Sequence, residues 1–165
     1  FLITIKDLFS NKINNFSQKI SHFGFSFLIL SILLNSIFSS EIITNLRVGE
    51  QFKSNKSTII FNSLEEKDGK NYKSIIGNFE IKDNKYSIKF KPELRIYNQP
   101  ITITSEADIK TSLFSDKFLV INLVKNNEYF NVRYQVKPFM VWIWISTLVM
   151  VVGGFLNLFK KLYEK

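Results

Sequence analysis

Two long runs of uncharged, mostly apolar residues interrupt an otherwise polar chain. The first covers residues 20–40 and contains no ionisable side chain except His22. The second covers residues 138–159, between Lys137 and Lys160. At about 1.5 Å per residue, either run can form a helix that crosses a hydrocarbon core of roughly 30 Å. The pattern predicts two transmembrane helices, because so short a chain offers no amphipathic neighbours that would bury them in a soluble core.

The charges beyond these helices predict their orientation. The N-terminal tail, 1–19, carries three lysines and one aspartate, and the C-terminal tail, 160–165, carries three lysines and one glutamate. Positively charged flanks stay on the cytoplasmic or matrix side, so both tails are expected there. Trp142 and Trp144 are expected near the opposite interface. The first run is longer than the apolar core of a cleaved signal peptide, which predicts a permanent anchor.

Residues 41–137, between the two runs, alternate polar and apolar positions as half-buried strands do. Turn-forming residues separate the strands, as expected for tight hairpins. The pattern predicts a membrane protein of the α+β class, in which two transmembrane helices flank an extracytoplasmic antiparallel β domain, either a sandwich or a small barrel. Residues 105–112 lack alternation and fit a short helix or a covering loop. The predicted strands are 58–61, 72–81, 85–90, 118–124 and 129–136, and the turns are Asp68-Gly69, Asp83-Asn84 and Asn126-Asn127.

Composition limits the chemistry that this chain can carry out. It has no cysteine and one histidine, which excludes disulfides, thiolate nucleophiles, CxxC motifs and multi-histidine metal sites. The net charge is +8, but the charges of residues 41–137 are scattered along the alternating segments. Nucleic-acid binding, which requires a basic stripe or patch, is therefore not expected. Glu65-Glu66 is expected in a solvated loop, and no catalytic set such as Ser–His–Asp is present.

His22 is the candidate functional residue, because an ionisable side chain inside a transmembrane run usually has a function. A neutral imidazole is a frequent axial ligand of haem iron. The alternative is an interfacial histidine that reaches the headgroups and has no further role. Small and polar residues in the same run predict close packing against other helices; they are Gly24, Ser26, Ser31 and Asn35.

A series of short motifs occurs in a fixed order between residues 20 and 159. It comprises His22-Phe-Gly24, Asn71-Tyr72 with Gly77 and Phe79, Lys91-Pro-Glu-Leu-Arg-Ile-Tyr97, Ser105-Glu-Ala-Asp-Ile109, Leu113-Phe114 with Asp116, Lys137-Pro-Phe139, Trp142-Ile-Trp144, and Met150 with Gly153-Gly154. In this order and spacing the chain resembles the C-terminal part of the CcmF family, the multi-spanning haem lyase subunit of cytochrome c maturation. Ser146 and Lys117-Phe118 depart from the family pattern.

The resemblance implies a role for His22 as one axial ligand of the iron of a membrane-held haem b. That haem would be shared with the remainder of the lyase, so the chain would be a fragment or one piece of a split protein and not catalytic alone. The β domain would lie over the site where haem is attached to apocytochrome c. Glu93 and Arg95 would form a buried or interface ion pair, or else both would lie in solvent.

The resemblance also implies partners and a location. The expected partners are the Trp-rich multi-spanning part of the lyase, other cytochrome c maturation subunits, apocytochrome c and membrane lipid, without nucleic acid. A composition typical of AT-rich codons indicates an organelle or an AT-rich bacterium. The expected location is the mitochondrial inner membrane, with a bacterial inner membrane as the alternative. Two other functions fit the same topology: a non-catalytic structural subunit of a respiratory complex, and an anchored β-domain receptor.

Overall fold

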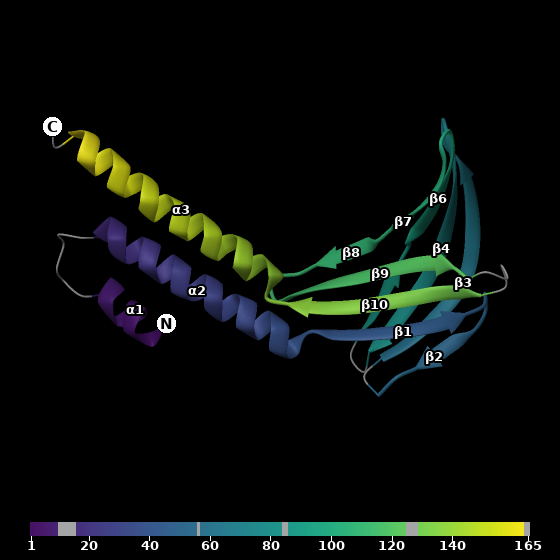
Figure 1. Cartoon of the computed structure of the whole chain (residues 1–165). Coiled ribbons are helices and arrows are strands. Elements are labelled where there is room, and N and C mark those ends of the chain that lie inside the picture. Colours follow the sequence, from purple (N-terminus) through teal and green to yellow (C-terminus); the bar gives the residue numbers. More distant parts are fainter. Residues whose placement is uncertain (10–15, 56, 84–85, 125–128, 164–165) are drawn as a thin grey trace. The chain divides into compact units, whose positions relative to one another are not determined.

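The computed structural model describes residues 1–9, 16–55, 57–83, 86–124 and 129–163, and the chain forms two compact units. The helical unit comprises Phe1–Ser39, Thr111–Asp116 and Lys137–Lys165. The β unit comprises Ser40–Lys110 and Lys117–Val136. Figure 1 shows the elements of both. Each unit is described separately below.

The helical unit contains α1 (Leu2–Leu8), α2 (Phe16–Phe38) and α3 (Met140–Tyr163). Among the described residues, Phe16–Phe38 and Met140–Phe159 are long and apolar enough to cross a membrane. Both overlap the two predicted runs, 20–40 and 138–159. Helix α2 begins at Phe16, before the start of the predicted run, and ends at Phe38.

Helices α2 and α3 pack closely and antiparallel through a seam of small residues. Ser17 lies beside Asn157 near one end, and the Asn35 side-chain amide donates to the Pro138 carbonyl at 2.5 Å near the other. A Cβ added to Gly24 would lie 2.6 Å from the Met150 backbone nitrogen, so the helix backbones nearly touch there. Glycine allows this close approach because it has no side chain to hold the backbones apart.

Among its described residues, the β unit has ten antiparallel strands in two sheets. One sheet has the order β1-β10-β9-β8, and the other has the order β2-β3-β4-β6-β7 with β5 paired to β4. The strands are β1 (Ser40–Leu46), β2 (Gln51–Lys53), β3 (Ser57–Asp68), β4 (Tyr72–Asp83), β5 (Ser87–Phe90), β6 (Glu93–Asn98), β7 (Ile101–Glu106), β8 (Asp108–Thr111), β9 (Ser115–Leu123) and β10 (Phe130–Pro138).

Both sheets contribute alternate residues to one core, which makes the β unit a sandwich. The ring of Phe61 stacks on that of Phe79 at 4.2 Å and meets the edge of Phe130 at 5.5 Å. Phe130 belongs to the other sheet, so aromatic contacts join the two layers. The remaining buried apolar residues are Leu46, Ile59, Ile81, Phe90, Leu94, Leu119, Ile121, Val132 and Tyr134.

The structure confirms the predicted strands in β3, β4, β5, β9 and β10 and corrects two other predictions. Glu65-Glu66 lies within β3, because pairing with Ile76 and Ile75 of β4 extends that strand beyond its apolar part. Residues 105–112 form neither a helix nor a loop, since they contain the end of β7 and all of β8. The Asp68-Gly69 turn joins β3 to β4. Asn84, Asn126 and Asn127 lie outside the described residues.

Two adjacent glycines of α3 provide a matched test of the helix seam. A Cβ on Gly153 would lie 2.6 Å from the Ser21 backbone nitrogen, whereas one on Gly154 would meet nothing within 4 Å. Gly153→Ala should therefore weaken α2–α3 packing by about 1–3 kcal/mol, while Gly154→Ala should not. The measurement is disulfide formation between cysteines placed at Ser17 and Asn157. Equal cross-linking in both variants would contradict the seam.

Tyr134 should make the β sandwich sensitive to alkali. Burial, with the charges of Tyr86 and Asp83, raises the pKa of Tyr134 from 10.0 to about 12. Its contribution to stability is complete below pH 10 and is lost as the pH rises towards 12, because only the unfolded phenol then ionises. The loss should be roughly 1–2 kcal/mol after allowance for solvent screening.

Urea unfolding of the detergent-solubilised chain at pH 9 and at pH 12, followed by circular dichroism, measures this loss. Tyr134→Phe should reduce the alkaline destabilisation, whereas Tyr72→Phe, at a half-buried tyrosine, should not. An identical alkaline loss in the two variants would show that other groups cause it.

Candidate functional site

His22 lies on α2 beside the seam and is exposed. Ser21 and Gly24, on either side of it in the sequence, both contact α3. Because successive residues advance about 100° around a helix, the His22 side chain leaves α2 to the side of that contact. The imidazole is therefore available to a group outside the α2–α3 pair.

An apolar stripe continues from His22 along α2. Phe25, Ile29 and Ile32 follow at helical spacing and are 55%, 44% and 49% exposed. Helix α1 covers a different side of α2, where the Phe1 ring stacks on Phe23 and Phe27 at 5.8 and 5.7 Å. Among the elements the structure describes, α2 makes its contacts with α3 and α1, which leaves the His22 stripe open.

The chemistry of this stripe would suit a haem. An imidazole nitrogen can bind the iron, and the apolar residues that follow suit the hydrophobic macrocycle. In the described part of the chain no three His, Cys, Asp or Glu residues gather as a metal site. A bis-histidine site would therefore need its second ligand from another polypeptide segment, since His22 is the chain's only histidine.

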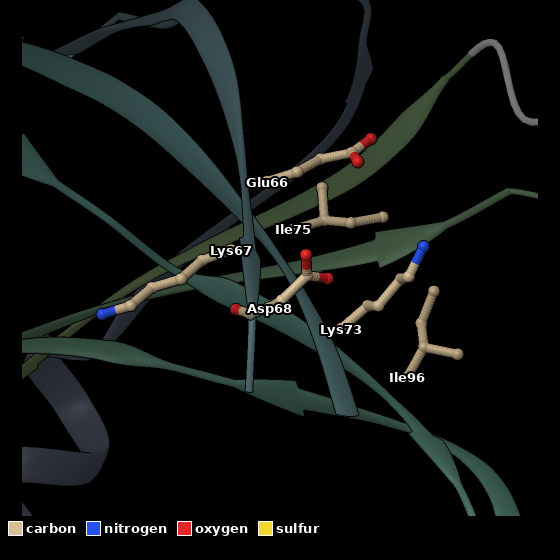
Figure 2. A pocket seen from close by; sticks show the side chains of 7 residues that line it. Glu66, Lys67, Asp68, Lys73, Ile75 and Ile96 are labelled. Carbon is tan, nitrogen blue, oxygen red and sulfur yellow. The ribbon is translucent and has the colours of Figure 1, made fainter. Parts of the chain in front are cut away.

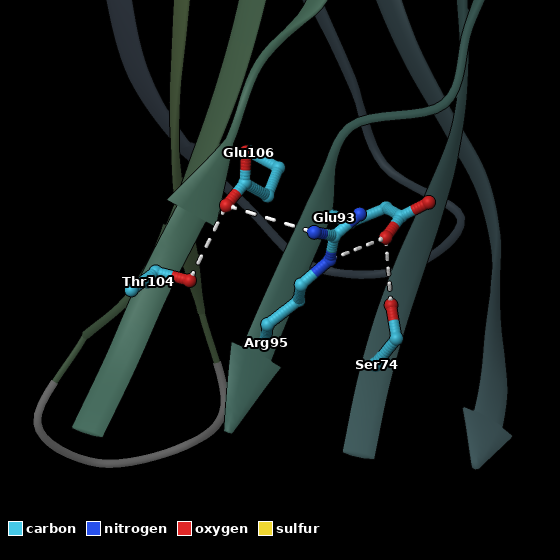
Figure 3. A network of polar contacts seen from close by, with 5 residues as sticks. All are labelled: Ser74, Glu93, Arg95, Thr104 and Glu106. Atoms are coloured by element: carbon cyan, nitrogen blue, oxygen red, sulfur yellow. Dashed lines mark hydrogen bonds and ion pairs between the residues drawn. The ribbon is translucent and has the colours of Figure 1, made fainter. Parts of the chain in front are cut away.

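A polar network crosses β4, β6 and β7 in the β unit (Figure 3). The Arg95 Nε donates to Glu93 Oε2 at 3.2 Å, and the Ser74 hydroxyl donates to the same oxygen at 3.1 Å. Glu106 lies 3.9 Å from the Arg95 guanidinium and accepts from the Thr104 hydroxyl. Hydrogen bonds with Tyr97 and then Glu93 raise the pKa of Arg95, so its charge is permanent.

The network confirms a Glu93–Arg95 ion pair, in a half-buried setting. Their side chains are 30% and 32% exposed, so the pair is not a fully desolvated one. The roles of Ser74 and Glu106 could not be predicted from the sequence, because strand register alone brings them to Arg95. The network braces three neighbouring strands, and no member shows the geometry of a nucleophile with its base.

A pocket of about 210 Å³ lies near the end of the β3–β4 hairpin (Figure 2). Its lining combines two acidic side chains, two basic ones, one hydroxyl and two apolar ones: Glu66, Lys67, Asp68, Lys73, Ser74, Ile75 and Ile96. It is smaller than typical organic-ligand pockets of roughly 300–1,000 Å³. The pocket is therefore a poor cofactor site, and His22 remains the better candidate for one.

Known proteins resemble this chain over most of its length. The family model for the CcmF C-terminal beta-sandwich matches residues 37–138. The cytochrome c-type biogenesis protein ccl1 of Rhodobacter capsulatus is 30% identical over 151 residues, which is 91% of this chain and 23% of that protein. The cytochrome c-type biogenesis protein CcmF of Pseudomonas aeruginosa is 26% identical over 148 residues, 89% of this chain and 22% of that protein.

A solved structure shares the fold. The structure of the cytochrome c heme lyase CcmF superposes with a TM-score of 0.64 at 16% identity, covering 83% of this chain and 23% of that one. The chain thus spans less than a quarter of the length of these relatives.

Proposed function

Because this chain belongs to the CcmF family, we propose that it works as the C-terminal part of a cytochrome c haem lyase. The family match covers the β unit, and the aligned regions of the curated relatives also include most of the two apolar helices. Since the chain covers so little of each relative, the Trp-rich multi-spanning part of the lyase would come from another polypeptide or another part of the same one.

Within that assembly, His22 supplies one axial ligand of a haem b in the membrane. The observation that supports this assignment is the open apolar stripe on α2, where His22, the chain's only histidine, lies one turn from exposed Phe25. When bound, the haem would pass electrons that keep the substrate haem iron reduced. The chain's own part is to hold the iron from one side and to shield it with apolar side chains.

The β sandwich would lie on the outer side of the membrane, over the site of haem attachment to apocytochrome c. Antiparallel packing puts the start of α2 and the end of α3 at the same end of the helix pair. The lysine-rich tails 1–19 and 160–165 would then share the matrix or cytoplasmic side, with 41–137 on the other. The mitochondrial inner membrane is the proposed location, and a bacterial inner membrane the alternative.

His22→Ala, made with the rest of the lyase present, should lower the haem b content of the purified complex at least about tenfold. Even residues that only support a metal ligand change affinity by about 10–100-fold, so loss of the ligand itself should not cost less. The measurement is the reduced absorption spectrum per mole of complex, with the yield of cytochrome c.

Gln18→Ala is the matched control, because Gln18 is exposed on α2 about one turn before His22. It should leave both readouts unchanged. If a folded His22→Ala complex kept its haem, His22 would not be a ligand of that haem. If the chain copurified with a respiratory complex and no haem depended on His22, a structural subunit would be the better description.

A further inference from the structure

The hairpin that joins β8 to β9 has an unusual tip. The Ser112 amide donates to the Ser115 carbonyl at 3.1 Å, and the Ser112 hydroxyl accepts from the Ser115 amide at 3.1 Å. These bonds close a tight turn with Leu113 and Phe114 at its centre. Hairpin tips in water favour Asn, Asp and Gly at such positions. Here the two central side chains are large and apolar, and they are 54% and 62% exposed.

This turn is hydrogen-bonded to the start of α3 and to Phe139, the residue that precedes it. The Trp142 indole nitrogen donates to the Leu113 carbonyl at 2.8 Å, and the Phe139 amide donates to the Phe114 carbonyl at 2.9 Å. The Phe114 ring also stacks on Trp142 at 6.3 Å. Phe139 has a φ of 62°, which a bulky residue adopts only where its surroundings hold it. The segment Thr111–Asp116 is therefore part of the helical unit.

The bonding leaves the tip suited to an apolar environment. Trp142 of α3 and Phe139, the residue just before α3, satisfy the two tip carbonyls, so neither carbonyl depends on water. Backbone groups that enter lipid must have such partners. The outward surface consists of the Leu113 and Phe114 side chains, with Trp144 of the same α3 end 69% exposed. Trp side chains near the end of a spanning helix favour the headgroup layer.

We propose that Leu113 and Phe114 insert into the lipid headgroup layer and anchor the β8–β9 hairpin tip at the membrane surface. The partner is lipid because the tip is level with the first turn of α3, where the spanning segment enters the bilayer. The anchor is continuous with the lipid-exposed side of that helix. The proposal rests on α3 crossing the membrane and is independent of haem binding.

The chain has no cysteine, so single labels can be placed without background. A fluorescent NBD label is attached to Leu113→Cys or Phe114→Cys, and the full chain is reconstituted in vesicles of phosphatidylcholine and phosphatidylglycerol. The vesicles carry nitroxide lipids labelled either near the headgroup or near the acyl-chain end. Leu148→Cys, exposed in the middle of α3, is the control for a spanning helix, and Ile101→Cys is the control for an exposed apolar residue of the β unit.

Labels at residues 113 and 114 should show blue-shifted emission and lose more fluorescence to the shallow nitroxide than to the deep one. The label at Leu148 should be quenched more strongly by the deep nitroxide, and the label at Ile101 by neither. An unquenched label at 113 or 114 beside a quenched Leu148 label would overturn the anchor alone. An unquenched Leu148 label would overturn the spanning of α3, and the anchor with it.

The same labels in native membranes that contain the rest of the lyase complete the test. Continued quenching by added shallow nitroxide lipid would support lipid as the partner. Protection from both nitroxide lipids and aqueous iodide would mean that another protein segment covers the tip, which would overturn the proposal. Unchanged circular dichroism of each variant shows that it is folded.

Discussion

The antiparallel pairing of β1 with β10 is the constraint on which the rest of the structure depends. Its register begins at Leu46 with Phe130 and ends at Ser40 with Val136. Paired strands lie roughly 4.8 Å apart, and α2 and α3 connect to this end of the pair within two residues. The last turn of α2 and the first turn of α3 therefore lie close together, and small residues along their seam allow the two helices to stay in contact.

Some polar residues of α2 and α3 hold the two helices together, whereas His22 does not. The buried hydroxyls of Ser31 and Ser146 donate to carbonyls one turn earlier in their own helices. Their hydrogen-bonding capacity is therefore used within each helix, and both side chains are small. Asn35 joins the helices directly through Pro138. His22 takes no part in this packing, which separates the side chain that can bind metal from those that hold the helices together.

The β unit contributes a scaffold with an apolar core and a polar network on three of its strands. Its core is aromatic and shared by both sheets, and the Glu93–Arg95–Glu106 network braces three adjacent strands. The hairpin tip at Leu113 and Phe114 behaves differently: its chain position lies in the β region, but its hydrogen bonds assign it to the helical unit. The boundary between the helical unit and the β unit thus follows contacts in space and not position along the chain.

The sequence alone determined the features that depend on local pattern. Uncharged length predicted α2 and α3, and period-two alternation predicted β3, β4, β5, β9 and β10. The place of an ionisable side chain inside an apolar run selected His22 as the candidate functional residue. It failed where pairing between strands set the outcome. Strand β1 is held by β10, far along the chain, whereas β8 is held by its hairpin with β9 and Glu65-Glu66 by pairing with β4. Only the tertiary structure decided that Gly153 packs against α2 while Gly154 does not, and that the His22 stripe is left open. It also decided that Trp142 donates a hydrogen bond to the hairpin tip. Each outcome depends on which face of an element meets a partner.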